Sequence, residues 1–292
     1  MSNKEKLVLK IAFVMLCVGL IGSLISYRFK GGLETISEAK EFSPAELSHI
    51  QIDTDLANVK VISNTEEKIL VKFEGEVKKR NKVEFRAEIQ NNTLLIESKE
   101  SNSENWFNFD IGGIKHRLDI VLSIPEKEYE SLSINNHLGK IGLQGINVLH
   151  IDIQNKAGEI NLSGINTKEI QAETLTGSIE LKNINSQQTR TESKHGDIYF
   201  EQVTGALIGE TTNGDIHVDV ENIDNPIDLQ TINGEIEIKT KQEPLNVRLL
   251  ANTKFGNINI LGNSLPYLNI GDEQNEINLS TINGSIIVRK TQ

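Results

Sequence analysis

Apolar and polar positions repeat through residues 132–288 at intervals of 18 to 28 residues, most of them close to 19. When the repeated glycines are aligned, the residue two places after each is always isoleucine, and the residue four places after it is always large and apolar. The position between is mostly polar, so the period is two, which is typical of a short strand with one buried face. The aligned glycines are Gly139, Gly158, Gly177, Gly196, Gly214, Gly234, Gly256 and Gly284.

A second strand is predicted before each glycine. Mostly apolar residues recur seven and five places before it, as at Ile151 and Ile153. Each unit of about 19 residues therefore contains a strand, a tight turn that ends at glycine, a second strand and a second turn. Turns as short as Asn213-Gly214 predict a positive φ at the glycine, which glycine tolerates at little steric cost.

Two architectures are compatible with this repeat. Asn-Gly between alternating strands is also typical of a hairpin, which would give an antiparallel meander. We favour an all-β fold, a parallel β-solenoid (β-helix) in which each unit is one coil, because stacked coils give equivalent positions the same environment. An isoleucine column inside the coils, at roughly 1.5–3 kcal/mol for each buried side chain, would be structural and not catalytic.

The residues before the repeats are organised differently. A degenerate first coil has Ala57 in the glycine position, with Ile50 and Ile52 before it and Val59 and Val61 after it. Residues 65–128 alternate as half-buried strands without the period and predict a small antiparallel sheet that caps the first end. The expected organisation is a polar tether at 31–46, the first coil and cap at 47–128, and the repeats at 129–292.

Residues 1–30 predict one transmembrane helix. The run from Ile11 to Tyr27 has 17 residues without a charge, with lysines before it and Arg28 and Lys30 after it. It is just long enough to span a bilayer if Lys10 snorkels. The alternative is a cleaved signal peptide, although no small-x-small cleavage site follows the run. The lysines slightly favour a cytoplasmic amino terminus, and the absence of cysteine after residue 30 fits an extracytoplasmic domain.

Charge restricts the partners. The formal net charge is −11, and the first 30 residues carry +4, so the other residues carry −15. An acidic surface of this kind repels nucleic acid and anionic lipid headgroups. The sequence therefore predicts no nucleic-acid partner, and contact with a membrane only through the amino-terminal helix.

These features together resemble a known family. They are the amino-terminal span, the strand that ends in Ser123-Ile124-Pro125, and repeats of the form Asn-Gly-Asp/Glu-Ile-x-Val. The pattern resembles the bacterial "putative adhesin" family of β-strand-repeat proteins over about residues 47–290, and the length and anchor are similar to LiaG-type proteins of Gram-positive bacteria. The resemblance implies a membrane-anchored protein associated with the envelope stress response, with no established biochemical activity and no catalytic residues.

The sequence offers few residues for chemistry. Acidic residues that follow the glycines could form a calcium ladder, but Ser178 and Ser285 interrupt the column, and a solvated turn column is the simpler interpretation. The histidines fall in different columns and do not form an obvious ligand set. The coils are short, and their loops contain no plausible acid–base pair, so a polysaccharide-active enzyme is the third choice and no cofactor is predicted. The acidic residues of the column are Glu159, Asp197, Asp215 and Glu235.

Two places are candidates for contact with a partner. One is the aromatic stretch with Trp106, Phe107 and Phe109, which could alternatively plug the join between cap and solenoid. The other is Ile287, an outward apolar residue of the last coil, whose strand could pair with another chain.

The leading hypothesis is a non-catalytic envelope protein that acts as an accessory in stress response or maintenance through other envelope membrane proteins. The alternative is an adhesin or a module that binds cell-wall glycan or teichoic acid.

Overall fold

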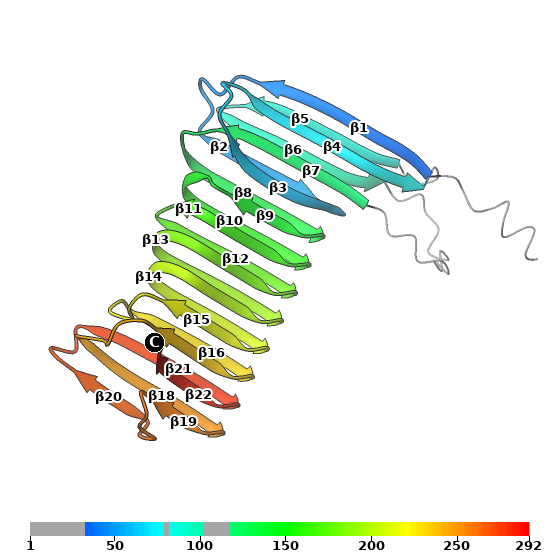
Figure 1. The fold of residues 1–292 in the computed structure, drawn as a ribbon. Coiled ribbons are helices and arrows are strands. Elements are labelled where there is room, and N and C mark those ends of the chain that lie inside the picture. Colours follow the sequence, from blue (N-terminus) through cyan, green and yellow to red (C-terminus); the bar gives the residue numbers. More distant parts are fainter. Residues whose placement is uncertain (1–32, 79–81, 102–116, 292) are drawn as a thin grey trace, which may run out of the picture.

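The structure, a computed structural model, describes residues 33–78, 82–101 and 117–291. These residues form 22 strands in one continuous hydrogen-bonded system that coils into two facing sheets (Figure 1). Within the described ranges no helix is long and apolar enough to cross a membrane. The predicted transmembrane helix at 1–30 lies outside the described residues.

One sheet collects the strands that precede the glycines, and we call it the pre-glycine sheet. Its strands in spatial order are β5 (Lys82–Gln90), β6 (Thr93–Ser101), β2 (His49–Thr54), β8 (Glu128–Leu138), β10 (Asn147–Ala157), β12 (Glu169–Thr176), the later parts of β13 (Ile179–His195) and β14 (Ile198–Asn213), β16 (Ile227–Asn233), β21 (Asn275–Asn283), β18 (Val247–Phe255) and β20 (Tyr267–Ile270).

The facing sheet collects the strands that follow the glycines, and we call it the post-glycine sheet. Its strands in spatial order are β1 (Leu33–Phe42), β4 (Ile69–Lys78), β7 (Arg117–Pro125), β3 (Ala57–Asn64), β9 (Ile141–Gln144), β11 (Ile160–Asn166), the first parts of β13 and β14, β15 (Ile216–Val220), β17 (Ile236–Thr240), β22 (Ile286–Lys290) and β19 (Ile258–Ile260).

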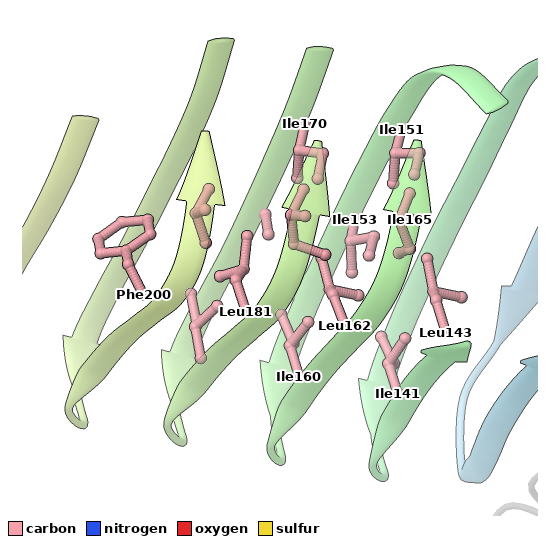
Figure 2. Packing of buried hydrophobic residues seen from close by; sticks show 14 of the residues in the cluster. Ile141, Leu143, Ile151, Ile153, Ile160, Leu162, Ile165, Ile170, Leu181 and Phe200 are labelled. Carbon is pink, nitrogen blue, oxygen red and sulfur yellow. The ribbon is translucent and has the colours of Figure 1, made fainter. Parts of the chain in front are cut away.

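The parallel solenoid is confirmed, and the antiparallel meander is wrong. Ile160 pairs in parallel with Ile141 on one side and Ile179 on the other, and the same register continues along the stack. No hairpin forms at Asn213-Gly214: the part of β14 that precedes this turn pairs with β16, and β15, which follows it, pairs in parallel with the first part of β14 and with β17. Figure 2 shows the isoleucines of successive coils pointing into the space between the sheets. All eight repeat isoleucines are buried except Ile258, which lies in the outermost coil and is half-buried.

The repeated glycines are required by close approach between coils more than by turn geometry. A Cβ at Gly234 would overlap the carbonyl oxygen of Gly214 in the neighbouring coil, and the same overlap occurs at every step of the glycine column. Positive φ angles of 139–158° occur only in the first four glycines of the column, Gly139 to Gly196. The positive φ predicted at Asn213-Gly214 and the other Asn-Gly turns is therefore wrong.

A polar column runs beside the glycines and was not expected from the sequence. The residue three places before each glycine is Asn, Ser or Thr, and its side chain donates a hydrogen bond of 2.8–3.4 Å to the carbonyl at the glycine position of the neighbouring coil. Buried polar groups need such partners. The column comprises Asn136, Asn155, Thr174, Ser193, Thr211, Thr231, Thr281 and Thr253.

Replacing Thr231 with valine tests this column. Valine keeps the shape of the side chain but removes the hydroxyl that donates to the Gly214 carbonyl at 3.0 Å. We expect the free energy of unfolding to fall by about 1–3 kcal/mol, since a buried acceptor loses its donor. Thr231→Ser keeps the donor and should cost clearly less. Urea unfolding of the two variants measures the difference, and equal losses would contradict the hydrogen-bond account.

The amino-terminal end differs from the prediction. Residues 33–42, for which the sequence predicts a polar tether, form β1, which pairs antiparallel with β4 along its whole length. Ile36 and Phe42 pack against the core from this strand, which explains why apolar residues occur among its polar ones. The cap contains the predicted antiparallel pairs, but β6 and β7 also pair in parallel with β2 and β3 of the first coil.

The carboxyl-terminal end exchanges the order of its last two coils. The final coil, β21 and β22, lies between β16–β17 and β18–β19, and Figure 1 shows β21 and β22 next to β18 and β19. Ile286 therefore pairs with Ile236 on one side and with Ile258 on the other. The prediction that the final strand is free to pair with another chain is wrong, because both of its edges are occupied.

Candidate functional site

The outer surface of the post-glycine sheet carries a continuous row of side chains at the outward position between the two buried residues of each strand. Parallel register places Tyr199, His217, Glu237 and Ile287 side by side on β14, β15, β17 and β22. The rings of Tyr199 and His217 stack, with centroids 5.1 Å apart and planes 14° apart. We call these four residues the outer row.

Glu237 is the electrostatic centre of the outer row. Its carboxylate accepts from Arg289 at 2.6 Å and Lys239 at 3.1 Å, and His217 Nδ1 lies 3.5 Å away. The side chain is only 14% exposed. Burial raises the pKa of this carboxyl, but the hydrogen bonds from Lys239 and Arg289 outweigh burial and leave the pKa below its usual value.

Replacing Glu237 with glutamine is expected to destabilise the fold by about 1–2 kcal/mol at pH 7, because two cations lose a nearly buried acceptor. A lowered folded pKa means that the carboxylate stabilises the fold above its usual pKa of about 4.5, and that this contribution is lost as the pH falls through the folded pKa. The difference between wild type and variant should therefore shrink at acidic pH, as measured by urea unfolding at several pH values. Glu243→Gln is the control, since that side chain is 75% exposed. A difference that does not change with pH would contradict this role.

A hydrogen bond to Asp197 fixes the side chain of Tyr199, the first residue of the outer row. Its hydroxyl donates to Asp197 Oδ2 at 3.0 Å, and its pKa is raised by burial and by the Asp197 hydrogen bond and charge. A shallow groove surrounds the two rings, and its lining adds Glu180, Glu201 and Asp219 on neighbouring positions. The groove combines apolar ring surface with hydrogen-bond acceptors and a few cations, which suits non-covalent binding of a partner.

The acidic column beside the glycines has a structural role. Asp197 Oδ1 accepts the backbone N–H of Asp215 at 2.9 Å, and Asp215 Oδ1 accepts that of Glu235 at 2.7 Å. The side chain of one coil thus satisfies the backbone of the next. Among residues 33–78, 82–101 and 117–291, no group of three or more His, Cys, Asp or Glu side chains is arranged to hold a metal ion.

The predicted contact residues separate into two groups. Trp106, Phe107 and Phe109 lie outside the described residues. Ile287 is half-buried in the outer row, beside Glu237 on one side and Asn259 on the other. When the repeats are aligned on their glycines, Tyr199, His217 and Glu237 appear only as polar and varied residues at the outward position. That pattern does not indicate the stack of Tyr199 on His217 or the cations around Glu237.

The two-sheet solenoid and its side-chain rows define a repeat scaffold whose outer surfaces present side chains in register from coil to coil. The family model described as Toastrack DUF4097 matches residues 47–289, and the chain therefore belongs to the Toastrack family. The expected membership of the adhesin-like β-strand-repeat family is confirmed.

Solved structures with a similar fold carry adhesin descriptions. A "putative adhesin" from Bacteroides fragilis shares 14% identity and a TM-score of 0.50, over 88% of this chain and 97% of that one. A "putative cell adhesion protein" from Clostridium sporogenes shares 15% identity and a TM-score of 0.35, over 88% and 100%. A "putative adhesin" from Parabacteroides distasonis shares 11% identity and a TM-score of 0.41, over 86% and 97%. At these identities the likeness concerns the fold alone. A search of curated proteins finds no significant match.

Proposed function

We propose that this chain is a non-catalytic interaction protein of the bacterial cell envelope. Residues 1–30 anchor it in the cell membrane as a single span with a cytoplasmic amino terminus, and the solenoid stands outside. It is of the LiaG type and acts as an accessory in the response to envelope stress, through contacts with envelope membrane proteins. The family membership and the uncharged run at 11–27 support this proposal.

The outer row is the single observation that carries the proposal. Tyr199 and His217 provide stacked rings, Glu237 provides a charge centre, and Ile287 provides apolar surface, all on one rigid sheet. Rings and arginines on a preformed surface are the groups that dominate protein–protein binding energy. A rigid surface also loses little entropy on binding, so a partner needs few strong contacts.

Cross-linking in cells followed by pull-down tests the proposal. The full-length chain is compared with a version whose residues 1–30 are replaced by an unrelated membrane anchor, and with Tyr199→Ala/His217→Ala. Both versions with an intact solenoid should capture the same membrane protein, and the double variant should lose it. Gln171→Ala/Glu173→Ala, on the outer surface of β12 in the opposite sheet, is the matched control. Capture that depends on residues 1–30 and not on the outer row would contradict the proposal.

The second candidate function is an adhesin or a module that binds cell-wall glycan or teichoic acid. The adhesin description of the Bacteroides fragilis structure favours it, as does Tyr199, which is 37% exposed beside acceptor carboxylates. Teichoic acid is anionic, and the acidic chain could bind it only through divalent cations, whereas a neutral glycan would need none. An enzyme that acts on polysaccharide is the least supported function.

Sedimentation with purified wall material separates these ligands. Binding that survives EDTA would favour a neutral glycan, and binding abolished by EDTA would favour teichoic acid. If the chain stays in solution under both conditions, the adhesin candidate is wrong and the accessory function remains.

A further inference from the structure

The carboxyl-terminal end of the solenoid exposes apolar surface. The end is formed by β18, β19, β20 and the segment 261–266, which Figure 1 shows beyond β21 and β22, and we call it the open end. It carries three of the four most exposed large hydrophobic residues in the described part of the chain. They are Phe255 at 62%, Tyr267 at 56% and Leu265 at 55%. Exposed apolar side chains gathered in one place indicate an interaction surface.

The backbone at the open end is only partly covered. β20 pairs with Val247–Leu250 of β18, and the next N–H, of Ala251, donates to the Pro266 carbonyl at 2.8 Å. Among the strands that the structure describes, none pairs with the outer edge of Asn252–Phe255. An uncovered edge beside apolar side chains favours pairing with a further strand.

The opposite end of the solenoid is protected against association by charged side chains on its edge strand. Its outermost strand in the post-glycine sheet, β1, pairs with β4 over all ten residues and carries Glu34, Glu38, Lys40 and Glu41. Charged side chains on an edge strand oppose association with another chain. The open end therefore has apolar side chains beside an uncovered strand edge, which favours self-association, whereas the opposite end has charged side chains, which oppose it.

Charge along the chain points to the same end. Residues 31–240 carry a formal charge of −16 and residues 275–292, which form the inserted coil, carry +1, whereas residues 241–274, which include the open end, carry 0. Two copies repel each other through most of their length, but the open end is close to neutral. It has both signs, with Arg248 and Lys254 on β18 and Asp272 and Glu273 after β20, so a two-fold contact can pair unlike charges.

We propose that the open end binds the open end of a second copy of this chain. The contact is isologous, with the free Asn252–Phe255 edges of the two β18 strands antiparallel and with Phe255 and Tyr267 buried between the copies. β18 has nine residues. The end face, which β20 shares with β18, is about as long as β18, or about 30 Å, and two sheets with their side chains are about 20 Å thick, so contact over the whole face buries roughly 600 Å² of each copy. That area is at the low end for specific interfaces, and the dimer is therefore weak and dependent on concentration.

Sedimentation velocity of the full-length chain in detergent tests the proposal, at total concentrations from about 1 to 100 µM, where a weak dimer dissociates. Wild type should show a dimer that grows with concentration, and Phe255→Lys/Tyr267→Lys should weaken it by at least about tenfold. Leu175→Lys is the control, because that side chain is 45% exposed in the middle of the stack; it should leave the dimer unchanged. A wild type that stays monomeric, or a dimer equally weakened by Leu175→Lys, would overturn the proposal.

Engineered cysteines show which surfaces meet. In a Cys17→Ser background, Lys254→Cys should form disulfide-linked dimers under mild oxidation. Lys194→Cys has the same position relative to its glycine in a middle coil and is also exposed, so it should not cross-link. Cross-linking of both variants to the same extent, or of neither, would exclude the end-to-end arrangement.

Discussion

Alanine in place of Gly234 is expected to destabilise the solenoid by about 4 kcal/mol or more, or to prevent folding. The added Cβ would overlap the carbonyl oxygen of Gly214, which is rigid backbone and cannot move aside without separating the coils. The φ of Gly234 does not lie in the positive region reserved for glycine, so the loss would report the close approach alone.

Gly142→Ala is the matched control for this prediction. Gly142 lies on β9, whereas Gly234 lies in the turn between β16 and β17, and a Cβ at Gly142 would meet only the carbonyl oxygen of Asn161 at 4.0 Å, an ordinary contact. This variant should unfold at or slightly above the wild-type temperature, because alanine also restricts the unfolded chain. Thermal unfolding followed by circular dichroism compares the two. Similar stability of Gly234→Ala and wild type would show that the coils are not packed as described.

Deletion of residues 275–292 is expected to unfold much of the carboxyl-terminal half. The deletion removes Ile277, Leu279, Ile286 and Val288, all buried, and at roughly 1.5–3 kcal/mol each they account for about 6–12 kcal/mol. It also separates β18 and β19 from the coil below, because β21 and β22 lie between them and β16 and β17. If the coils instead stacked in sequence order, the same deletion would only shorten the rod. Limited proteolysis distinguishes the two: new cleavage within 241–274 is expected.

Paired cysteines check the coil exchange without deleting residues. Asp228 is the register partner of Asn278, so Asp228→Cys/Asn278→Cys should form a disulfide on oxidation. Stacking in sequence order would instead bring residue 228 beside Leu250, which lies two coils away in this structure. Cross-linking of Asp228→Cys/Leu250→Cys, and not of the first pair, would refute the exchange.

The parallel stack was predictable because each coil has the same residues at the same positions. Identical isoleucines need identical environments, and only a stack in register provides them. The same identity hides the order of the coils: Ile236 can pair equally well with Ile258 or with Ile286, so no local pattern indicates which coil is inserted. The strand β1 was missed for a related reason. It is an edge strand with few buried side chains, and most of its residues are as polar as those of a tether.

The contacts of the outer row also depend on the order in which the coils stack. Arg289 and Glu237 are far apart in sequence, and they meet at 2.6 Å only because β22 lies beside β17. Stacking in sequence order would have placed Leu261 of the following coil in that position, so the carboxylate would keep Lys239 but lose the arginine. Tyr199 and His217 belong to successive coils, so their contact follows once the parallel register is known. The residue types of the outer row can thus be read from the sequence, but which of them lie in contact follows only from the order of the coils in the fold.

The most direct test of the central claim, that the outer row recognises a partner, uses a photo-cross-linking amino acid in the full-length chain in cells. Position 199 lies in the outer row, and position 171 lies on the outer surface of the pre-glycine sheet. We predict that a membrane protein of the envelope is cross-linked from position 199 and not from position 171. Cross-links of equal strength from both positions, or from position 171 alone, would contradict the account.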